Sequence, residues 1–299
     1  MRAAFVINAR QKQDYVARSV RGALEQTYPC EVVLSDQCST DQTLQIMRDT
    51  VDSFGPTHHT VKIVQCPIDL PFSMEAANRH MDWLWQQTSP ECDWIFQASA
   101  DDYSLPDRVK ICMEAVDANP CSAVACTMFF EKPGETNRQS VSGYPRESGY
   151  IKAGEGLMRL AYGSTIGGYS REFLAKYAAL AGKHTPDVLW GWLAALDKGF
   201  YVVSNPQHVH CEVASLTNMG FQGKLRAATG EDALRVAELN HFQLCNLYDR
   251  CATLAQEFHP DGVPADDWSA VIQMVLGQTG AWLRAREVLH EHGLTPGVL

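Results

Sequence analysis

Three groups of polar residues stand where short apolar runs of the sequence end. Residues 8–10 (Asn-Ala-Arg) follow the first run, residues 35–41 follow the second, and residues 99–102 (Ser-Ala-Asp-Asp) follow a later one. In open α/β sheets, ligands bind at the carboxyl ends of the strands. We therefore expect the three groups to lie along one edge of a sheet and to form a ligand site there.

The adjacent carboxylates of Asp101 and Asp102 indicate a cation. Such a pair repels unless a cation neutralises it. Hard oxygen ligands suit Mg²⁺ or Mn²⁺, which bind a substrate diphosphate through one or two carboxylates. Taken alone, however, the pair is explained better by a solvated turn that caps the helix predicted from Pro106.

Alternating strands and helices are predicted to position these groups. Short apolar runs predict strands, and apolar residues at spacings of three and four predict helices. This rhythm indicates an α/β fold with a mostly parallel central sheet and helices on both faces. The predicted strands are residues 3–7, 31–34, 61–64 and 93–97, and the predicted helices are residues 13–26, a helix capped by Ser39 or Thr40 that includes Met47, residues 73–85, and a helix that opens at Pro106.

The second half of the chain predicts a long loop and a helical end. Residues 131–150 are polar and rich in Gly, Pro and Ser, which indicates a loop of the kind that often forms a mobile lid. We predict a catalytic domain over residues 1–218 and a helical C-terminal extension over residues 219–299. The other predicted elements are a buried strand at residues 123–130, strands at 164–170 and 200–203, and helices at 154–161, 186–196, 231–257 and 266–292.

Several motifs occur in an order that resembles the family 2 glycosyltransferases, which have the GT-A (Rossmann-like) fold. Residues 26–29 (Gln-Thr-Tyr-Pro) and 39–41 (Ser-Thr-Asp) match the opening of that family. Residues 100–108 (ADDYSLPDR) match its Asp-x-Asp-Asp…Leu-Pro-Asp-Lys/Arg block. The resemblance extends over residues 1–217, and several motifs in one order are more specific than any one of them.

The resemblance implies an inverting, metal-dependent transferase that takes a sugar from a nucleotide-sugar, with a UDP-sugar as the expected donor. It implies that Asn8, Ala9 and Arg10 line the nucleotide pocket. Asp36 would accept a hydrogen bond from the uracil ring. Asn78, in a stretch similar to the family's Ala-Arg-Asn, is expected to support the nucleotide-sugar, with a helix-surface amide as the alternative.

The same resemblance implies a set of metal ligands for Mn²⁺ or Mg²⁺. Asp101 would coordinate the ion, with Asp102 beside it in the same shell. The family often has a His near the metal or diphosphate after a late strand, and residues 207–210 (Gln-His-Val-His) stand there. Alternation along an extended chain places His208 and His210 on one face. We assign His210 to the metal with His208 as the fallback, and a structural histidine explains either one as simply.

Inverting transfer also needs a carboxylate that takes the proton of the attacking acceptor hydroxyl. The family places this group at the start of a helix, and Asp187 stands there, so Asp187 is the predicted general base. A carboxylate favoured by the helix dipole is the alternative. Residues 167–169 (Gly-Gly-Tyr) resemble an acceptor-side segment, or form a plain turn. Trp190 and Trp192 have the ring type that stacks on sugars, but at helical spacing Trp is more often in the core.

Five residues depart from the family's pattern and leave room for a divergent donor or acceptor. They are Ser99 for the first Asp of Asp-x-Asp, Gln37 and Cys38 for the Asp-Gly of Asp-Asp-Gly-Ser, Ala77 for the Arg of Ala-Arg-Asn, and Pro186 for the Glu of Glu-Asp.

Composition limits the partners. The net charge is -10 and the sequence pI is about 5.4. No Lys/Arg cluster is visible, so nucleic acid is an unlikely partner. The expected acceptors are glycan, lipid-linked or other hydroxyl compounds, and a modified nucleobase stays among them. The C-terminal helices leave a homo-oligomer open.

The ten cysteines form no C-x-x-C pair, which indicates reduced, mostly buried thiols in a cytoplasmic protein. No apolar run approaches the roughly 20 residues of a membrane-spanning helix, and none resembles a secretory signal. We therefore expect a cytoplasmic location without a transmembrane segment.

Two other functions stay open at this point. A nucleotidyltransferase also joins an α/β nucleotide fold to metal-binding carboxylates, but residues 8–12 lack the glycines of a phosphate loop. A catalytically inactive glycan-binding protein of the same fold is the other alternative, because fold alone does not determine function.

Overall fold

The computed structural model describes residues 1–70, 74–132, 138–140, 147–151, 167–181 and 186–211. The chain divides into two compact units, Met1–Cys211 and Glu212–Leu299. The second unit lies outside the described residues, as does the helix predicted at residues 154–161. The helical extension and the boundary near residue 218 therefore stay predictions.

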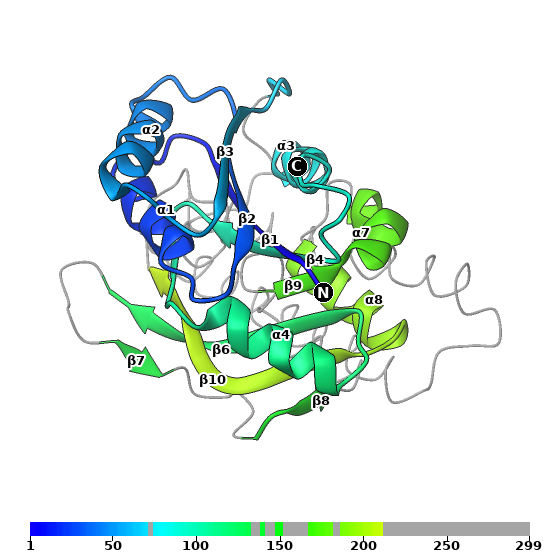
Figure 1. The fold of residues 1–299 in the computed structure, drawn as a ribbon. Coiled ribbons are helices and arrows are strands. Elements are labelled where there is room, and N and C mark those ends of the chain that lie inside the picture. The colour runs from blue at the N-terminus through cyan, green and yellow to red at the C-terminus, as the bar shows by residue number, and fades with distance from the viewer. Residues whose placement is uncertain (71–73, 133–137, 141–146, 152–166, 182–185, 212–299) are drawn as a thin grey trace, which may run out of the picture. The chain divides into compact units, whose positions relative to one another are not determined.

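A ten-stranded mixed sheet forms the centre of the first unit (Figure 1). The strands β3, β2, β1 and β4 lie side by side in parallel, as the strand–helix rhythm predicts. Beyond β4 the order continues as β9, β6, β10 and β5, and β9 is antiparallel to both of its neighbours. The strands are β1 Ala3–Ala9, β2 Cys30–Asp36, β3 Thr60–Gln65, β4 Trp94–Ser99, β5 Tyr103–Ser104, β6 Ala123–Glu131, β7 Gln139–Ser140, β8 Gly149–Ile151, β9 Gly167–Ser170 and β10 Phe200–Cys211.

Helices cover both faces of the sheet, which confirms the predicted α/β class. Alternate side chains of a strand face opposite layers. Phe5 and Ile7 of β1 join a core cluster with residues of α1, α2 and α4. On the other face, Ser35 Oγ of β2 lies 2.7 Å from His80 Nε2 of α3. The helices are α1 Val16–Leu24, α2 Thr43–Phe54, α3 Met74–Trp85, α4 Arg108–Ala118, α7 Arg171–Tyr177, α8 Pro186–Leu196 and a 3₁₀ helix at Ala178–Ala181.

The start of α2 differs from the prediction. The helix begins at Thr43, where Asp41 Oδ1 accepts a hydrogen bond from the Thr43 amide at 3.0 Å. The residue that precedes the helix is Gln42, and its side chain makes no capping hydrogen bond. The hydroxyls of Ser39 and Thr40 instead accept hydrogen bonds from Gln11, so the caps predicted at Ser39 and Thr40 are wrong, and Asp41 binds the first helical amide.

Strands extend further than predicted in the second half. The segment predicted as a loop at residues 131–150 contains β7 and the start of β8 among its described residues. The last strand, β10, continues past residue 203 to Cys211, and its register against β6 shifts between Val203 and His208. Such an irregularity lets a strand pass through a proline, here Pro206. Both predicted histidines therefore lie inside a strand rather than after it.

Close packing explains the pair of glycines at residues 167 and 168. Both lie in β9, and a Cβ at Gly168 would collide with the ring of Phe96 in β4. Trp190 and Trp192 of α8 are fully buried and belong to the core. Residues 167–169 therefore do not form a plain turn. Trp190 and Trp192 are not available to stack on a sugar.

The eight cysteines among the described residues are free, and all of them except Cys38 are buried. This agrees with the reduced thiols expected from their spacing. Within the described part of the chain, no helix is long and apolar enough to cross a membrane.

Candidate active site

The ends of β1, β2 and β4 meet in register at one edge of the sheet. Asn8 pairs with Ser35 of β2 and with Ser99 of β4, and Ala9 pairs with Asp36. The three polar groups found in the sequence therefore lie side by side.

Two left-handed residues shape the loops at this edge. Gln11 has φ 54° and Cys38 has φ 48°. The amide side chain of Gln11 joins the loops, since Nε2 donates to Thr40 Oγ1 at 3.0 Å and Oε1 accepts from the Thr40 amide at 2.7 Å. A left-handed conformation costs a residue with a Cβ about 1–2 kcal/mol. Cys38 thus adopts the left-handed conformation at the position where the resembling family has Gly. The hydrogen bonds between Gln11 and Thr40 help to hold this loop.

Asp36 is buried at the end of β2, with 1% of its surface exposed. Its Oδ2 accepts a hydrogen bond from the Ser39 amide at 3.1 Å. Its Oδ1 has no hydrogen-bond partner among the described residues. A buried acceptor without a partner costs about 1–3 kcal/mol. A ligand that donates a hydrogen bond would remove this cost.

The start of α3 is held against this edge. Gln37 Nε2 donates to the carbonyls of Ile68 at 3.2 Å and Ala76 at 3.1 Å. The amide at position 37 thus provides a structural tie that a carboxylate could not make, because a carboxylate has no donor. Asn78 of α3 is buried rather than on the helix surface, so the alternative given for it is wrong.

Arg10 and His80 lie close to the same edge. Arg10 Nη1 donates to the Leu70 carbonyl at 2.6 Å. His80 is 1% exposed and bonds Ser35 Oγ. Burial, together with the charge of Arg10, lowers the pKa of His80 to about 3. His80 is therefore neutral at physiological pH.

The pKa of His80 predicts a loss of stability in mild acid. The unfolded state takes up a proton near pH 6.5, while the folded state does so only near the lowered pKa of about 3. The contribution of His80 to stability therefore falls as the pH drops through this window, by about 2 kcal/mol between pH 6.5 and pH 5. Urea unfolding at pH 7.5, 6.0 and 5.0 measures the slope. His80→Gln should make the slope shallower without abolishing it, because the buried His208 also has a lowered pKa; equal slopes for the two proteins would refute the assignment.

Asp101 lies beside a lysine. Lys12 Nζ, from the loop after β1, lies 2.6 Å from Asp101 Oδ2. The two side chains are 23% and 16% exposed, respectively, so the pair is reachable from solvent. Lys12 thus places a positive charge at this edge of the sheet. The family has an Arg at the position of Ala77, so this chain lacks that second positive charge.

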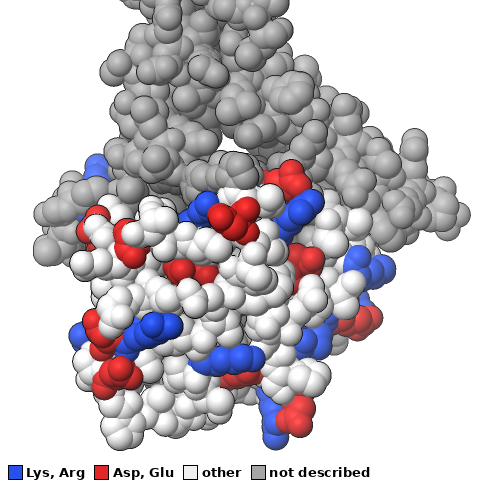
Figure 2. Space-filling view, turned by 90° about the horizontal axis from the view of Figure 1, so that it is seen from above, with Lys and Arg blue, Asp and Glu red and all other residues white. Residues whose placement is uncertain are grey.

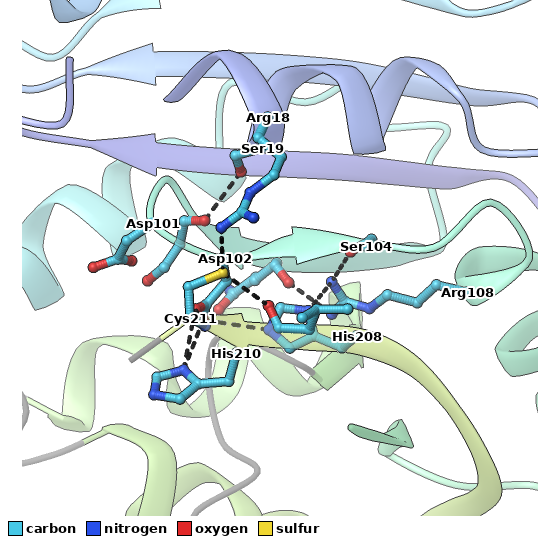
Figure 3. Close-up of polar contacts among 12 residues, drawn as sticks. Arg18, Ser19, Asp101, Asp102, Ser104, Arg108, His208, His210 and Cys211 are labelled. Atoms are coloured by element: carbon cyan, nitrogen blue, oxygen red, sulfur yellow. Dashed lines mark hydrogen bonds and ion pairs between the residues drawn. The ribbon is translucent and has the colours of Figure 1, made fainter. Parts of the chain in front are cut away.

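Asp102 points away from Asp101 into the protein, between two histidines (Figure 3). His208 Nε2 lies 3.3 Å and His210 Nδ1 3.2 Å from Asp102 Oδ2, and the Cys211 amide donates to Oδ1 at 3.0 Å. Burial alone would raise the pKa of Asp102, but the electrostatic attraction of His210 and the hydrogen bonds with His208 and His210 hold it well below its usual range. Asp102 is therefore a buried carboxylate whose two oxygens are already hydrogen-bonded.

Arg108 lies beyond His208 and is fully buried. Its Nη1 donates to Ser104 Oγ at 2.9 Å and lies 3.5 Å from His208 Nδ1, and its Nη2 donates to the Gln97 carbonyl at 2.7 Å. Burial lowers the pKa of His208 to about 4, against the opposing effect of Asp102. His208 is therefore neutral between a cation and an anion.

Tyr103 and Arg18 flank this cluster. Arg18 Nη2 lies 2.6 Å from Cys211 Sγ, and its guanidinium carbon lies 4.3 Å from the centre of the Tyr103 ring. Glu131 of β6 accepts hydrogen bonds from both side chains. A Cβ at Gly22 of α1 would lie 2.7 Å from the Ser104 carbonyl, so only Gly allows α1 to approach β5 this closely. The close contact fixes the segment that carries Asp102.

Within the described residues, no three His, Cys, Asp or Glu side chains are gathered around one point as a ready-made metal cage. Mg²⁺ sites often use only one or two protein carboxylates and complete their shell with waters and substrate phosphates. Figure 2 shows one face of the molecule, on which the described basic and acidic side chains are interspersed, without the single-sign stripe of a nucleic-acid surface.

The sequence matches a family model described as glycosyl transferase family 2 over residues 4–177, which is more than half of the chain. The chain belongs to this family. It is a glycosyltransferase. No curated protein matches it.

Solved structures confirm the GT-A fold of this glycosyltransferase. TarS 1–349 of S. aureus in complex with UDP has a TM-score of 0.55 and 18% identity over 82% of this chain and 66% of its own. The same protein with UDP-GlcNAc gives 0.54 and 19% over 82% and 67%. GalNAc-T7 with UDP, GalNAc and Mn²⁺ gives 0.53 and 10% over 80% and 48%. The chain thus spans less than two thirds of the first of these and of GalNAc-T7.

Three further residues of the candidate site differ in how far the sequence predicted them. Asp187 is the second residue of α8, but its side chain lies outside the described part, so its role as base stays a prediction. Sequence reasoning assigned no role to Lys12 or Arg108. Lys12 stands two residues after the first polar group, and Arg108 ends the Leu-Pro-Asp-Arg block. Their closeness in sequence to these motifs is the only feature that could have pointed to either residue.

Proposed function

We propose that this glycosyltransferase transfers the sugar of a UDP-sugar to an acceptor hydroxyl with inversion, using Mn²⁺ or Mg²⁺. The observation that carries the donor is Asp36 Oδ1, a buried acceptor at the strand edge without a partner among the described residues. The uracil ring offers an N–H donor of the kind that this oxygen lacks. Asn8, Ala9 and Arg10 lie beside Asp36 and would line the nucleotide, and Asn78 is proposed to support it from α3.

Asp101 and His210 are the residues that are proposed to hold the metal ion. The donor set supports this fit. Asp101 is a partly exposed carboxylate, and the side chain of His210 is 41% exposed with Nδ1 turned toward Asp102. Asp102 was predicted as a ligand itself, but its bonds to His208, His210 and Cys211 suit it better to supporting His210. The metal would neutralise charge on the departing nucleoside diphosphate.

Lys12 and Asp187 complete the proposed chemistry. Lys12 adds a cation next to Asp101, where the diphosphate would lie. Asp187, at the first turn of α8, is proposed to take the proton from the acceptor hydroxyl as that oxygen attacks the anomeric carbon. The acceptor is proposed to be a glycan, a lipid-linked or another hydroxyl compound.

A donor screen tests this function directly. The full chain is incubated with UDP-, GDP-, CDP- and ADP-sugars, with and without Mn²⁺ or Mg²⁺, and thermal stability and release of the nucleoside diphosphate are measured. We expect stabilisation by one UDP-sugar and metal-dependent release of UDP. Equal responses to all four nucleotides, or none, would contradict the proposed donor.

Replacing Asp36 by Asn tests the uracil contact. The amide oxygen can keep the hydrogen bond from the Ser39 amide, so the loop should be retained, but an NH₂ group then faces the donor of the uracil ring. We expect UDP affinity to fall by about 10- to 100-fold, or about 1.4–2.7 kcal/mol. Isothermal titration calorimetry with UDP and CDP measures it. Asp49→Asn, an exposed change on α2, is the control, and equal UDP affinity in both variants would contradict the contact.

A further inference from the structure

Four side chains form a continuous chain of polar contacts behind Asp101 (Figure 3). Arg108 contacts His208, His208 contacts Asp102, and Asp102 contacts His210, at 3.5, 3.3 and 3.2 Å. The first three residues are at most 3% exposed, whereas the side chain of His210 is 41% exposed. The chain therefore leads from the core to the surface of the site.

The position of the proton on His208 follows from its two neighbours. A guanidinium can only donate hydrogen bonds, so the Nδ1 that faces Arg108 must be the bare nitrogen. An ionised carboxylate can only accept, so the Nε2 that faces Asp102 must carry the proton. Both neighbours thus select the same tautomer of a buried, neutral ring.

The position of the proton on His210 follows in the same way. Asp102 accepts from His208 Nε2 and from the Cys211 amide, and it faces His210 through Nδ1. Since the carboxylate is acceptor-only, His210 Nδ1 must carry a proton. In the neutral ring the lone pair is then on Nε2, which points away from Asp102. In most metal sites, a histidine binds the metal through one ring nitrogen and donates the N–H of the other ring nitrogen to a carboxylate or a similar acceptor.

We propose that His208 and Arg108 are positioning residues that act through Asp102 to hold His210 with its proton on Nδ1 and its lone pair on Nε2. The use of that lone pair for a metal ion rests on the proposed function, whereas the placement of the proton does not. Arg108 keeps His208 from turning its proton inward, and His208 keeps Asp102 oriented toward His210.

The tautomer is measured directly by ¹H–¹⁵N correlation spectra of the full chain labelled with ¹⁵N-histidine, near neutral pH and without donor or metal. The signals of His210 are assigned with His210→Gln. We expect one form, with a protonated Nδ1 and a bare Nε2. A proton on Nε2, or a mixture of both forms, in the unmodified protein would overturn the proposal without any substitution in the chain of contacts.

Two substitutions at His208 separate positioning from mere packing. In His208→Gln the amide can accept from Arg108 and donate to Asp102, so His210 should keep its single tautomer. In His208→Leu the donor to Asp102 is lost, so His210 should show both tautomers, and Mn²⁺-dependent UDP affinity should fall by about 10- to 100-fold. A folded Leu variant with an unchanged tautomer would overturn the proposal. If that variant fails to fold, Arg108→Met takes its place, because it removes the guanidinium that faces His208 Nδ1; the same mixture is expected, and an unchanged tautomer would overturn the proposal.

The two readouts separate this inference from the proposed function. If the unmodified protein shows the expected tautomer but binds no metal with UDP, the metal assignment fails and the positioning chain stands. If the protein binds metal and UDP while His210 carries its proton on Nε2, the positioning chain and the assignment of His210 as a ligand fail, whereas the UDP-sugar donor and the metal site at Asp101 stand.

Discussion

Asp101→Asn is expected to lower sugar transfer by about a thousandfold, which corresponds to about 4 kcal/mol of transition-state stabilisation. The change removes one negative charge from the proposed metal site and leaves the size of the side chain unchanged. The fold should survive, because the Lys12–Asp101 pair is partly exposed and such pairs contribute at most about 1 kcal/mol. Measured kcat/KM with saturating Mn²⁺, together with the melting temperature, tests both statements.

Two further variants give this experiment its controls. Asp49→Asn removes a carboxylate from the exposed face of α2 and should leave transfer unchanged. Lys12→Met removes the partner of Asp101 but not the carboxylate, so it should reduce transfer less than Asp101→Asn does. Equal losses in the Lys12 and Asp101 variants would mean that Asp101 acts by holding Lys12 rather than a metal. Unchanged turnover in Asp101→Asn would refute the metal assignment.

Asp187→Asn is expected to reduce transfer by about 10²- to 10⁴-fold, the usual contribution of a general base. The loss should lie in kcat, because the acceptor proton is removed only in the transition state. Binding of UDP should stay the same, since the donor is proposed to lie against the ends of β1, β2 and β4. Initial rates with varied donor and acceptor, and UDP titrations, separate these effects.

A matched control for this variant lies on α4. Asp117 is exposed on that helix, so Asp117→Asn changes the net charge equally and should not affect the rate. If Asp187→Asn lowers melting temperature and rate together while kcat recovers at lower temperature, Asp187 would be a helix-stabilising carboxylate, the alternative given for it. A full rate at every temperature would remove it from the mechanism.

The sequence alone predicted the alternating strands and helices that build the parallel half of the sheet, and it predicted that three polar groups meet at one edge of it. Short apolar runs that alternate with helical periodicity leave few arrangements other than parallel strands joined by right-handed crossovers. The carboxyl ends of β1, β2 and β4 then fall together, which brings residues 8–10, Asp36 and Asp101 to one edge. Local patterns suffice here because each strand connects to the next through one helix.

Only the tertiary structure decided what each half of the Asp101–Asp102 pair contacts. Two neighbouring carboxylates look alike in sequence, yet Asp101 is near solvent beside Lys12 and Asp102 is buried beside His208 and His210. The difference depends on β10, whose pairing with β5 brings residue 208 next to residue 104. A local pattern cannot encode such a contact, because it joins residues about a hundred positions apart, and only the folded sheet specifies which of the two carboxylates points inward.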